Sequence, residues 1–166
     1  DLIAIYDAAG VEFSDGRKPL AARTYYARLT QALVTALTAP MSEGRLYEVD
    51  MRLRPSGTQG PVATSLQSFM SYQKEKAWTW EHLALTRARP IAGDAALMAE
   101  VESFRAELLA LPSDAAAIRK DVADMRRRIS DAKSPDGPFD AKIGAGRLQD
   151  IELTAQAAAL VTGIPE

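Results

Sequence analysis

The sequence has no cysteine and only one histidine among its 166 residues. Without cysteine, neither a disulfide framework nor a thiolate metal site is possible, and one histidine excludes a multi-histidine site. Any metal must therefore be held mainly by oxygen ligands. That preference indicates magnesium, manganese or calcium.

A basic surplus and long apolar runs are missing as well. The formal net charge is −2, whereas proteins that bind nucleic acid usually carry an excess of basic residues. No apolar run approaches the length of a membrane span, and no signal peptide opens the chain. We therefore expect no nucleic-acid partner, no membrane segment and a cytoplasmic location. Residues 1–7 already resemble the middle of a folded element, so we expect the chain to be part of a longer protein.

The most informative stretch, residues 47–55, alternates strictly between apolar and charged positions. As a strand it would place Glu48, Asp50, Arg52 and Arg54 on one face. Because residues two apart on a strand are separated by about 6.5 Å, the acids could reach one divalent cation and the arginines the adjacent anion. A metal-bound polyphosphate has that arrangement of charge. Alternation alone favours a merely half-solvated strand, but the segregation of acids from bases favours a binding site.

A glycine-rich turn follows at residues 55–61, with backbone amides available to an anion. It lacks the spacing of a Walker loop, and a plain hairpin turn is the commoner structure for such a sequence.

The rest of the chain predicts an α+β fold. A buried strand at 2–6, a loop at 8–19 and a helix at 21–37 precede the central stretch, and a short return strand at 62–64 follows it. Ser65 caps a helix whose apolar face continues to Trp80, although the region around Trp78 could instead begin a second helix. One of these two tryptophans is expected in the core. Asp94 and Asp114 begin two further helices, and a polar loop at 131–146 leads to a last helix at about 147–162.

Several polar residues in the second half have two possible roles. His82 could be a general base or a nucleotide contact, but a hydrogen-bonded structural histidine is the commoner case. Arg87 and Arg89 could bind phosphate or be ordinary surface charge. Asp150 and Glu152 lie near the start of the last helix, where the helix dipole favours acids whatever the function.

At this point the sequence resembles a known family, glutamine synthetase adenylyltransferase, a large bifunctional bacterial enzyme that attaches AMP to glutamine synthetase and removes it. The resemblance covers nearly the whole chain and rests on these short motifs: residues 46–57, 72–73, 77–82, 87–89, 93–94, 140–142 and 150–152. Glu48, Ser56 and the Trp-Thr-Trp-Glu-His run are more similar to the C-terminal, adenylylating half than to the deadenylylating half.

The resemblance implies a truncated nucleotidyltransferase palm like that of DNA polymerase beta over residues 1–93, followed by a helical region at 94–166. In such a palm three acids hold two Mg²⁺ ions on the nucleotide, here ATP. Asp1 matches the second acid and Asp50 the third, so both are implied as catalytic residues and metal ligands. Arg52 and Arg54 would neutralise the phosphates, and Ser56 and Gly57 would contact the nucleotide. The first acid would lie upstream of residue 1, so we expect this chain alone to be nearly inactive.

The implied reaction moves AMP from ATP to a tyrosine hydroxyl of glutamine synthetase and thereby regulates nitrogen assimilation. Two alternatives stay open. The chain could belong to the deadenylylating half, or its C-terminal helices could be a docking module for glutamine synthetase or a PII signal protein. Two departures from the family occur near the end, where Arg147 replaces the second of two adjacent glycines and Leu153 replaces a phenylalanine.

Overall fold

A computed structural model describes residues 1–45 and 47–163 of the chain. Leu46, the first residue of the motif that carries the resemblance, lies outside the described residues. The described residues form six α-helices and one two-stranded parallel sheet, so the predicted α+β class is confirmed. They divide into two compact units, residues 1–76 and residues 77–166.

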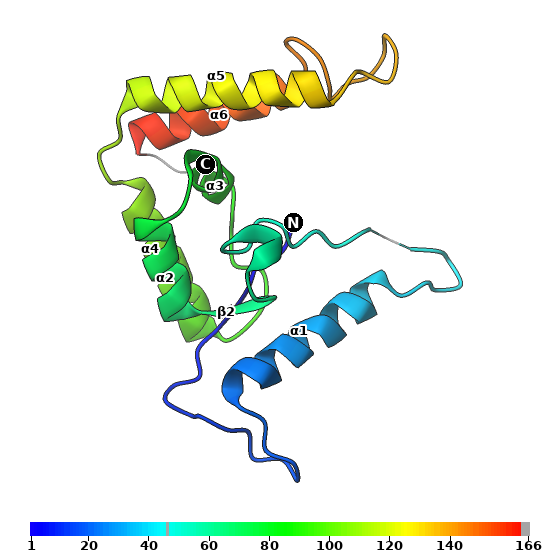
Figure 1. Cartoon of the computed structure of the whole chain (residues 1–166), viewed down its shortest axis with the longest axis vertical. Helices are drawn as coiled ribbons and strands as arrows, with labels where there is room; N and C mark the ends of the chain where they lie inside the picture. The colour runs from blue at the N-terminus through cyan, green and yellow to red at the C-terminus, as the bar shows by residue number, and fades with distance from the viewer. Residues whose placement is uncertain (46, 164–166) are drawn as a thin grey trace. The chain divides into compact units, whose positions relative to one another are not determined.

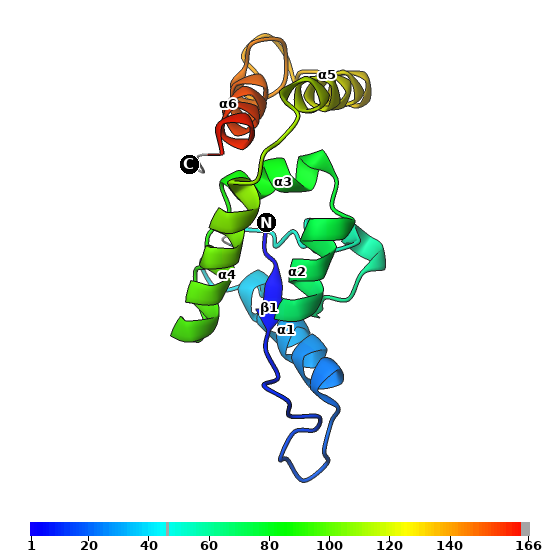
Figure 2. The same ribbon diagram turned by 90° about the vertical axis from the view of Figure 1, so that its left-hand side faces the viewer.

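The first unit is built on β1 (Ala4–Tyr6) and β2 (Ala63–Ser65), which pair in parallel with Ala4 opposite Ala63. Helix α1 (Ala22–Thr38) lies between them in sequence, and α2 (Leu66–Glu75) follows β2 directly. Figure 2 shows β1 running beside α2, and both helices contact the sheet. Pro40 follows the end of α1 as predicted, because proline cannot continue a helix.

Ser65 caps α2 as the sequence predicts, since its hydroxyl accepts a hydrogen bond from the Ser68 amide at 3.3 Å. The core of this unit is small and includes Ala63, Leu66 and Phe69. The apolar stripe of α1, by contrast, is exposed, with Leu29 and Leu33 about half accessible.

The described residues of the second unit, 77–163, form helices and connecting loops without a strand. This unit contains α3 (Thr79–Thr86), α4 (Ala95–Leu109), α5 (Ala115–Ala132) and α6 (Leu148–Thr162). Helices α5 and α6 lie side by side (Figure 1), and α3 contacts the other three helices of this unit. Its core is formed by large apolar side chains: Leu83, Leu85, Phe104, Leu108, Leu109, Ile118, Leu153 and Leu160.

Local signals in the sequence account for the ends of these helices. Asp94 accepts from the amides of Ala96 and Leu97, both at 3.0 Å, and thereby caps α4. Asp114 caps α5 in the same way. At the C-terminal end of α3, the buried guanidinium of Arg105 donates to the carbonyls of Leu85 and Thr86 at 3.1 and 3.2 Å. The last carbonyls of a helix have no acceptor role in its i to i+4 hydrogen bonds, so Arg105 provides donors for them.

Two predictions about the elements are wrong. Residues 47–55 do not form a strand; the chain there is irregular and turns from residue 52 onward. The reason lies in Asp50, whose carboxylate accepts from the Arg52 amide at 2.8 Å and so replaces a ladder bond with a local turn. The short strand β2 is therefore not the return arm of a hairpin but a parallel neighbour of β1.

The helix that begins at residue 66 also ends earlier than its apolar face suggests. It stops at Glu75, and the carboxylate of Glu81 accepts from the Trp78 amide at 3.0 Å at the start of α3. Neither tryptophan is in the core: Trp78 is 70% and Trp80 39% exposed. No helix among the described residues is long and apolar enough to cross a membrane. The boundary at residue 93, between a partial nucleotidyltransferase palm and a helical region, stays a prediction.

Candidate functional site

Asp50 and Arg52 form a two-pronged ion pair on the surface of the first unit. The Arg52 Nε and Nη2 atoms lie 2.8 and 2.5 Å from Asp50 Oδ2. Together with the amide bond from Arg52, these contacts hold the pKa of the Asp50 carboxyl down at about 2. The Arg52 side chain is 77% exposed and that of Asp50 is 32% exposed. Both groups are thus charged at neutral pH and open to solvent.

Arg54 has a different environment from Arg52. Its guanidinium donates to three backbone carbonyls of its own loop: Met51 at 2.8 Å, Gly60 at 3.2 Å and Thr58 at 3.4 Å. The two arginines that the sequence places side by side therefore have separate partners in the structure.

Ser56 and Gly57 lie at the turn that this guanidinium spans. Both have a positive φ, 62° at Ser56 and 55° at Gly57, and the Gly57 amide donates to the Arg54 carbonyl at 2.8 Å. Gly57 begins the 3-10 turn η1 (Gly57–Gln59). The Ser56 side chain is exposed and caps no helix amide, so its hydroxyl is accessible from solvent.

Asp1 and Asp50 come from segments that meet at the start of β1. The Leu2 amide donates to the Asp50 carbonyl at 2.8 Å, which makes residues 1 and 50 neighbours in space. Carboxylate oxygens suit Mg²⁺, which is commonly bound by one or two carboxylates completed by substrate phosphates and water. Among residues 1–45 and 47–163, no group of three or more acids and histidines is arranged to hold a metal.

The second unit holds a polar cluster that the sequence did not predict. Arg126 of α5 donates through Nε and Nη2 to the two carboxylate oxygens of Asp150 at 2.8 and 2.7 Å. The Gly146 amide donates to Asp150 as well, at 2.8 Å. These hydrogen bonds, that of Arg126 foremost, lower the pKa of Asp150. Asp150 therefore joins α5, α6 and the preceding loop.

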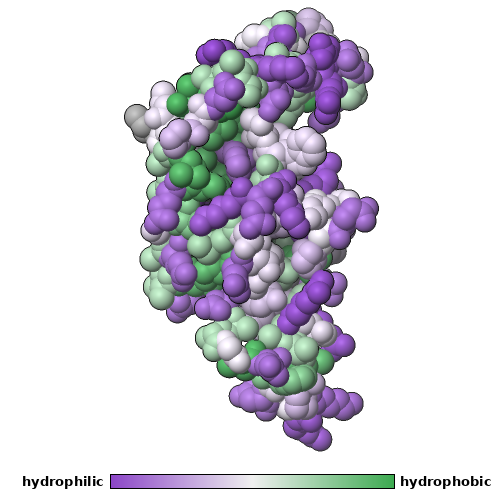
Figure 3. Space-filling view, turned by 60° about the vertical axis from the view of Figure 1, so that its left-hand side comes forward, coloured by the Kyte–Doolittle hydropathy of each residue, from purple (hydrophilic) through white to green (hydrophobic). Residues whose placement is uncertain are grey.

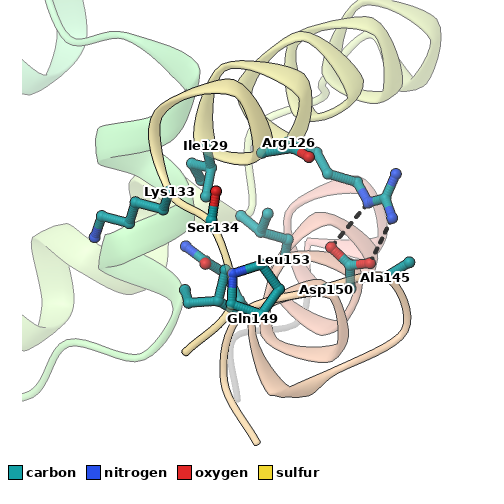
Figure 4. A pocket seen from close by; sticks show the side chains of 12 residues that line it. Arg126, Ile129, Lys133, Ser134, Ala145, Gln149, Asp150 and Leu153 are labelled. Carbon is teal, nitrogen blue, oxygen red and sulfur yellow. Dashed lines mark hydrogen bonds and ion pairs between the residues drawn. The ribbon is translucent and has the colours of Figure 1, made fainter. Parts of the chain in front are cut away.

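A pocket of about 280 Å³ lies beside this ion pair, between the end of α5 and the start of α6. Figure 4 shows Asp150 directed toward Arg126, with Leu153 near the centre of the view and the Lys133 ammonium directed away from the pair. The lining is mixed, with Ile129 and Leu153 next to Gln149 and Asp150.

The loop between α5 and α6 is held by two side chains. Asp140 accepts from the amides of Lys142, Ile143 and Asp136 at 2.8 to 2.9 Å, which holds its pKa at about 2. Arg147 donates to the carbonyls of Asp140, of Ile143 at 3.0 Å and of Pro138 at 3.2 Å. The glycines at 137, 144 and 146 were the available signal for such a compact loop, since all three have positive φ.

The remaining candidates occupy ordinary positions. Arg87 lies at the end of α3 with its guanidinium 4.0 Å from the carboxylate of Glu152 on α6. Arg89 is exposed, and His82 is half-buried in α3. Glu48 is exposed in the irregular segment before Asp50.

Comparisons with a family model and with curated proteins match this chain to the same kind of enzyme. The model of the family GlnE, glutamate-ammonia ligase adenylyltransferase, matches residues 1–104. The bifunctional glutamine synthetase adenylyltransferase/adenylyl-removing enzyme of Rhizobium meliloti (strain 1021) is 54% identical over 162 residues, which cover 97% of this chain and 16% of that protein. The enzyme of the same name from Brucella suis biovar 1 (strain 1330) is 52% identical over 161 residues, 96% of this chain and 16% of the relative. The one from Mesorhizobium japonicum is 52% identical over 164 residues, 98% of this chain and again 16% of the relative.

The chain thus spans about a sixth of the length of these curated relatives. Because the family model matches residues 1–104 of 166, the chain belongs to the family of glutamate-ammonia ligase adenylyltransferases.

Proposed function

We propose that this chain contributes part of the nucleotidyltransferase site of a longer enzyme that transfers AMP from ATP to a tyrosine of glutamine synthetase. The relatives are named as glutamine synthetase adenylyltransferases. The observation that supports the site is the hydrogen bond between the Leu2 amide and the Asp50 carbonyl, which brings together the two residues that match the family's acids.

In this proposal the tyrosine hydroxyl releases its proton to solvent and its oxygen bonds to the α-phosphorus of ATP. The bond from that phosphorus to the bridging oxygen breaks, and pyrophosphate leaves. Asp1 and Asp50 would hold Mg²⁺, which neutralises charge on the attacking and leaving oxygens when bound. The Ser56 hydroxyl and the Gly57 turn would lie against the nucleotide.

The Asp50–Arg52 ion pair has a specific consequence for this reaction. Asp50 cannot give its lone pairs fully to a cation while Arg52 occupies Oδ2 at 2.5 Å. We infer that the pair opens when the nucleotide binds. The Asp50 carboxylate would then be able to hold Mg²⁺, and the Arg52 guanidinium would be able to bind the phosphates. An exposed guanidinium suits that exchange, since it binds carboxylate and phosphate with the same planar geometry.

The test is Asp50→Asn in the intact protein. We expect AMP transfer to glutamine synthetase to fall by about a thousandfold or more, because asparagine lacks the charged carboxylate that would hold Mg²⁺. Such a loss corresponds to about 4 kcal/mol of the activation barrier. The circular dichroism spectrum should stay unchanged. Asp15→Asn, on an exposed loop, is the matched control and should leave transfer intact. Activity retained by the Asp50 variant would remove Asp50 from the site.

The direction of the reaction is a separate part of the proposal. The relatives are named for both adenylyl transfer and adenylyl removal, and we assign this chain to the adenylylating half. Assays of the Asp50→Asn protein in both directions distinguish the two. Loss of transfer with removal retained supports the assignment, whereas loss of removal alone assigns the chain to the deadenylylating half.

A docking role for the second unit is the other candidate, and one observation favours it. Phe139 is 96% exposed on the loop that Asp140 and Arg147 hold in place, and a rigid exposed aromatic side chain is typical of interface anchors. Titration of the intact protein and its Phe139→Ala variant with glutamine synthetase, and then with a PII protein, tests this role. Unchanged affinity for both partners would exclude Phe139 as an anchor.

A further inference from the structure

The Arg54 guanidinium donates three hydrogen bonds to carbonyls of its own loop. The donors Nη1, Nε and Nη2 lie 2.8, 3.2 and 3.4 Å from the carbonyl oxygens of Met51, Gly60 and Thr58. A guanidinium presents donors in fixed directions in one plane. A group that satisfies three carbonyls of one loop is well suited to fix the path of that loop.

The loop that Arg54 spans is tightly closed. A Cβ added at Gly60 would lie 1.9 Å from the Pro55 carbonyl oxygen, so the two sides of the loop are in direct contact there. Pro55 itself is buried, and Ser56 adopts a left-handed conformation that disfavours most side chains. A non-glycine residue with positive φ persists only where the surroundings hold it, and the Arg54 clamp supplies such a constraint.

The clamp lies between the two parts of the candidate site. Met51, whose carbonyl it binds, follows Asp50 directly, and the turn of Ser56 and Gly57 lies within the span from Met51 to Gly60. The Arg54 amide also donates to the Met51 carbonyl, at 3.3 Å. Fixing this loop therefore fixes the spacing between the Asp50–Arg52 pair and the turn.

We propose that Arg54 is a positioning residue, which holds residues 51–60 in the shape that the site requires and does not itself bind the nucleotide phosphates. The assignment of the loop as part of a nucleotide site rests on the proposed function above. The clamp itself does not, since it is a statement about hydrogen bonds within the chain.

The direct test is amide hydrogen exchange in the intact protein and its Arg54→Lys variant. Lysine keeps the charge but not the planar set of donors, so the amides of Gly57 and Gly60 should exchange about tenfold faster or more, the effect expected when hydrogen bonds to a charged group are lost. Arg23→Lys, exposed on α1, is the matched control and should exchange like the unaltered chain. Equal exchange at Gly57 and Gly60 in the Arg54 variant would overturn the proposal.

A measurement on the unaltered chain covers the case in which the variant does not fold. The Arg54 Nε–H should exchange slowly with water and show a through-bond NMR coupling to the Gly60 carbonyl. Fast exchange and no coupling would contradict the clamp without reference to any variant.

Kinetics of the intact protein then separate positioning from phosphate binding. For Arg54→Lys we expect kcat for AMP transfer to fall by about tenfold or more while KM for ATP changes by less than about threefold, since a misplaced group reduces the rate more than ground-state binding. A large rise in KM with kcat unchanged would instead make Arg54 a phosphate ligand. If the unaltered protein shows no AMP transfer, the proposed function fails, but the exchange experiment still decides the clamp.

Discussion

Asp50 and Arg52 show how a pair of charged residues two positions apart acquires its geometry. The sequence places them on one strand face, but the carboxylate bends the chain by accepting from the Arg52 amide at 2.8 Å and then receives the Arg52 side chain. The charge pattern and the family resemblance identify residues 1, 50, 52, 54, 56 and 57 as site candidates. The sequence could not predict that Arg52 pairs with a carboxylate while Arg54 binds backbone carbonyls. These partners depend on backbone turns, which the alternation of apolar and charged residues does not encode.

The first prediction concerns the charge of Asp50. Replacing Arg52 by Gln removes the strongest hydrogen bonds that lower its pKa, so the value should rise from about 2 toward the ordinary value of an aspartate, about 3.9. A pH titration of the Asp50 carboxyl by carbon-13 NMR measures this change. Arg23→Gln is the control. A pKa that stays near its original value would show that the ion pair does not form in solution.

Asp140 gives a second prediction at the same scale. Its folded pKa of about 2 lies below that of an unfolded aspartate, so its contribution to stability is fully present above about pH 4 and is lost as the pH falls toward 2. Asp140→Asn cannot take a charge and should remove that part of the acid sensitivity. Melting temperatures of both proteins, measured between pH 2 and 6, test this prediction. An equally steep fall of the melting temperature with decreasing pH in both proteins would contradict it.

At the scale of elements, the helices were easier to predict than the strands. Caps such as Ser65, Asp94 and Asp114 and the apolar spacing of α4, α5 and α6 act within a few residues, and they correctly located four helix starts within one or two residues. The strand predicted at 47–55 failed because a strand needs a neighbour along its length. Among the described residues, the hydrogen bond from the Leu2 amide to the Asp50 carbonyl is the only backbone bond that joins residues 47–55 to a neighbouring segment in this way.

The caps provide a prediction that belongs to this scale. Asp94→Ala leaves the amides of Ala96 and Leu97 without their acceptor and should lower the free energy of unfolding by about 1 kcal/mol. Asp94→Asn keeps the acceptor and should cost much less. Urea denaturation followed by circular dichroism measures both, and equal losses in the two variants would mean that the cap bonds do not carry the effect.

The two compact units of the chain differ in how many apolar side chains they bury. Residues 77–163 bury most of the large apolar core side chains. Both units also keep large apolar residues at the surface, such as Phe13 and the stripe of α1 in the first unit and Phe139 in the second. The face of the chain in Figure 3 accordingly shows hydrophobic residues exposed among hydrophilic ones. Binary patterning predicted the α1 stripe but not its exposure, because the pattern tells which face is apolar and not what covers it.

This difference in burial leads to a prediction about how the chain unfolds. Leu109 is 1% exposed in the second unit, and Leu111, two residues further on, is 57% exposed. Leu109→Ala should lower the free energy of unfolding by about 2–5 kcal/mol, the loss for a buried leucine and the cavity that it leaves. Leu111→Ala should change it by no more than about 0.5 kcal/mol, as for most surface positions.

Amide hydrogen exchange locates the effect within the chain. If each unit has its own stability, Leu109→Ala accelerates exchange in α3, α4 and α6 while the amides of β1, β2 and α2 keep their original rates. Acceleration by the same factor in both sets would show that residues 1–76 unfold only together with residues 77–166. In that case the clamp at Arg54 and the ion pair at Asp50 would depend on a helical core that contains neither of them.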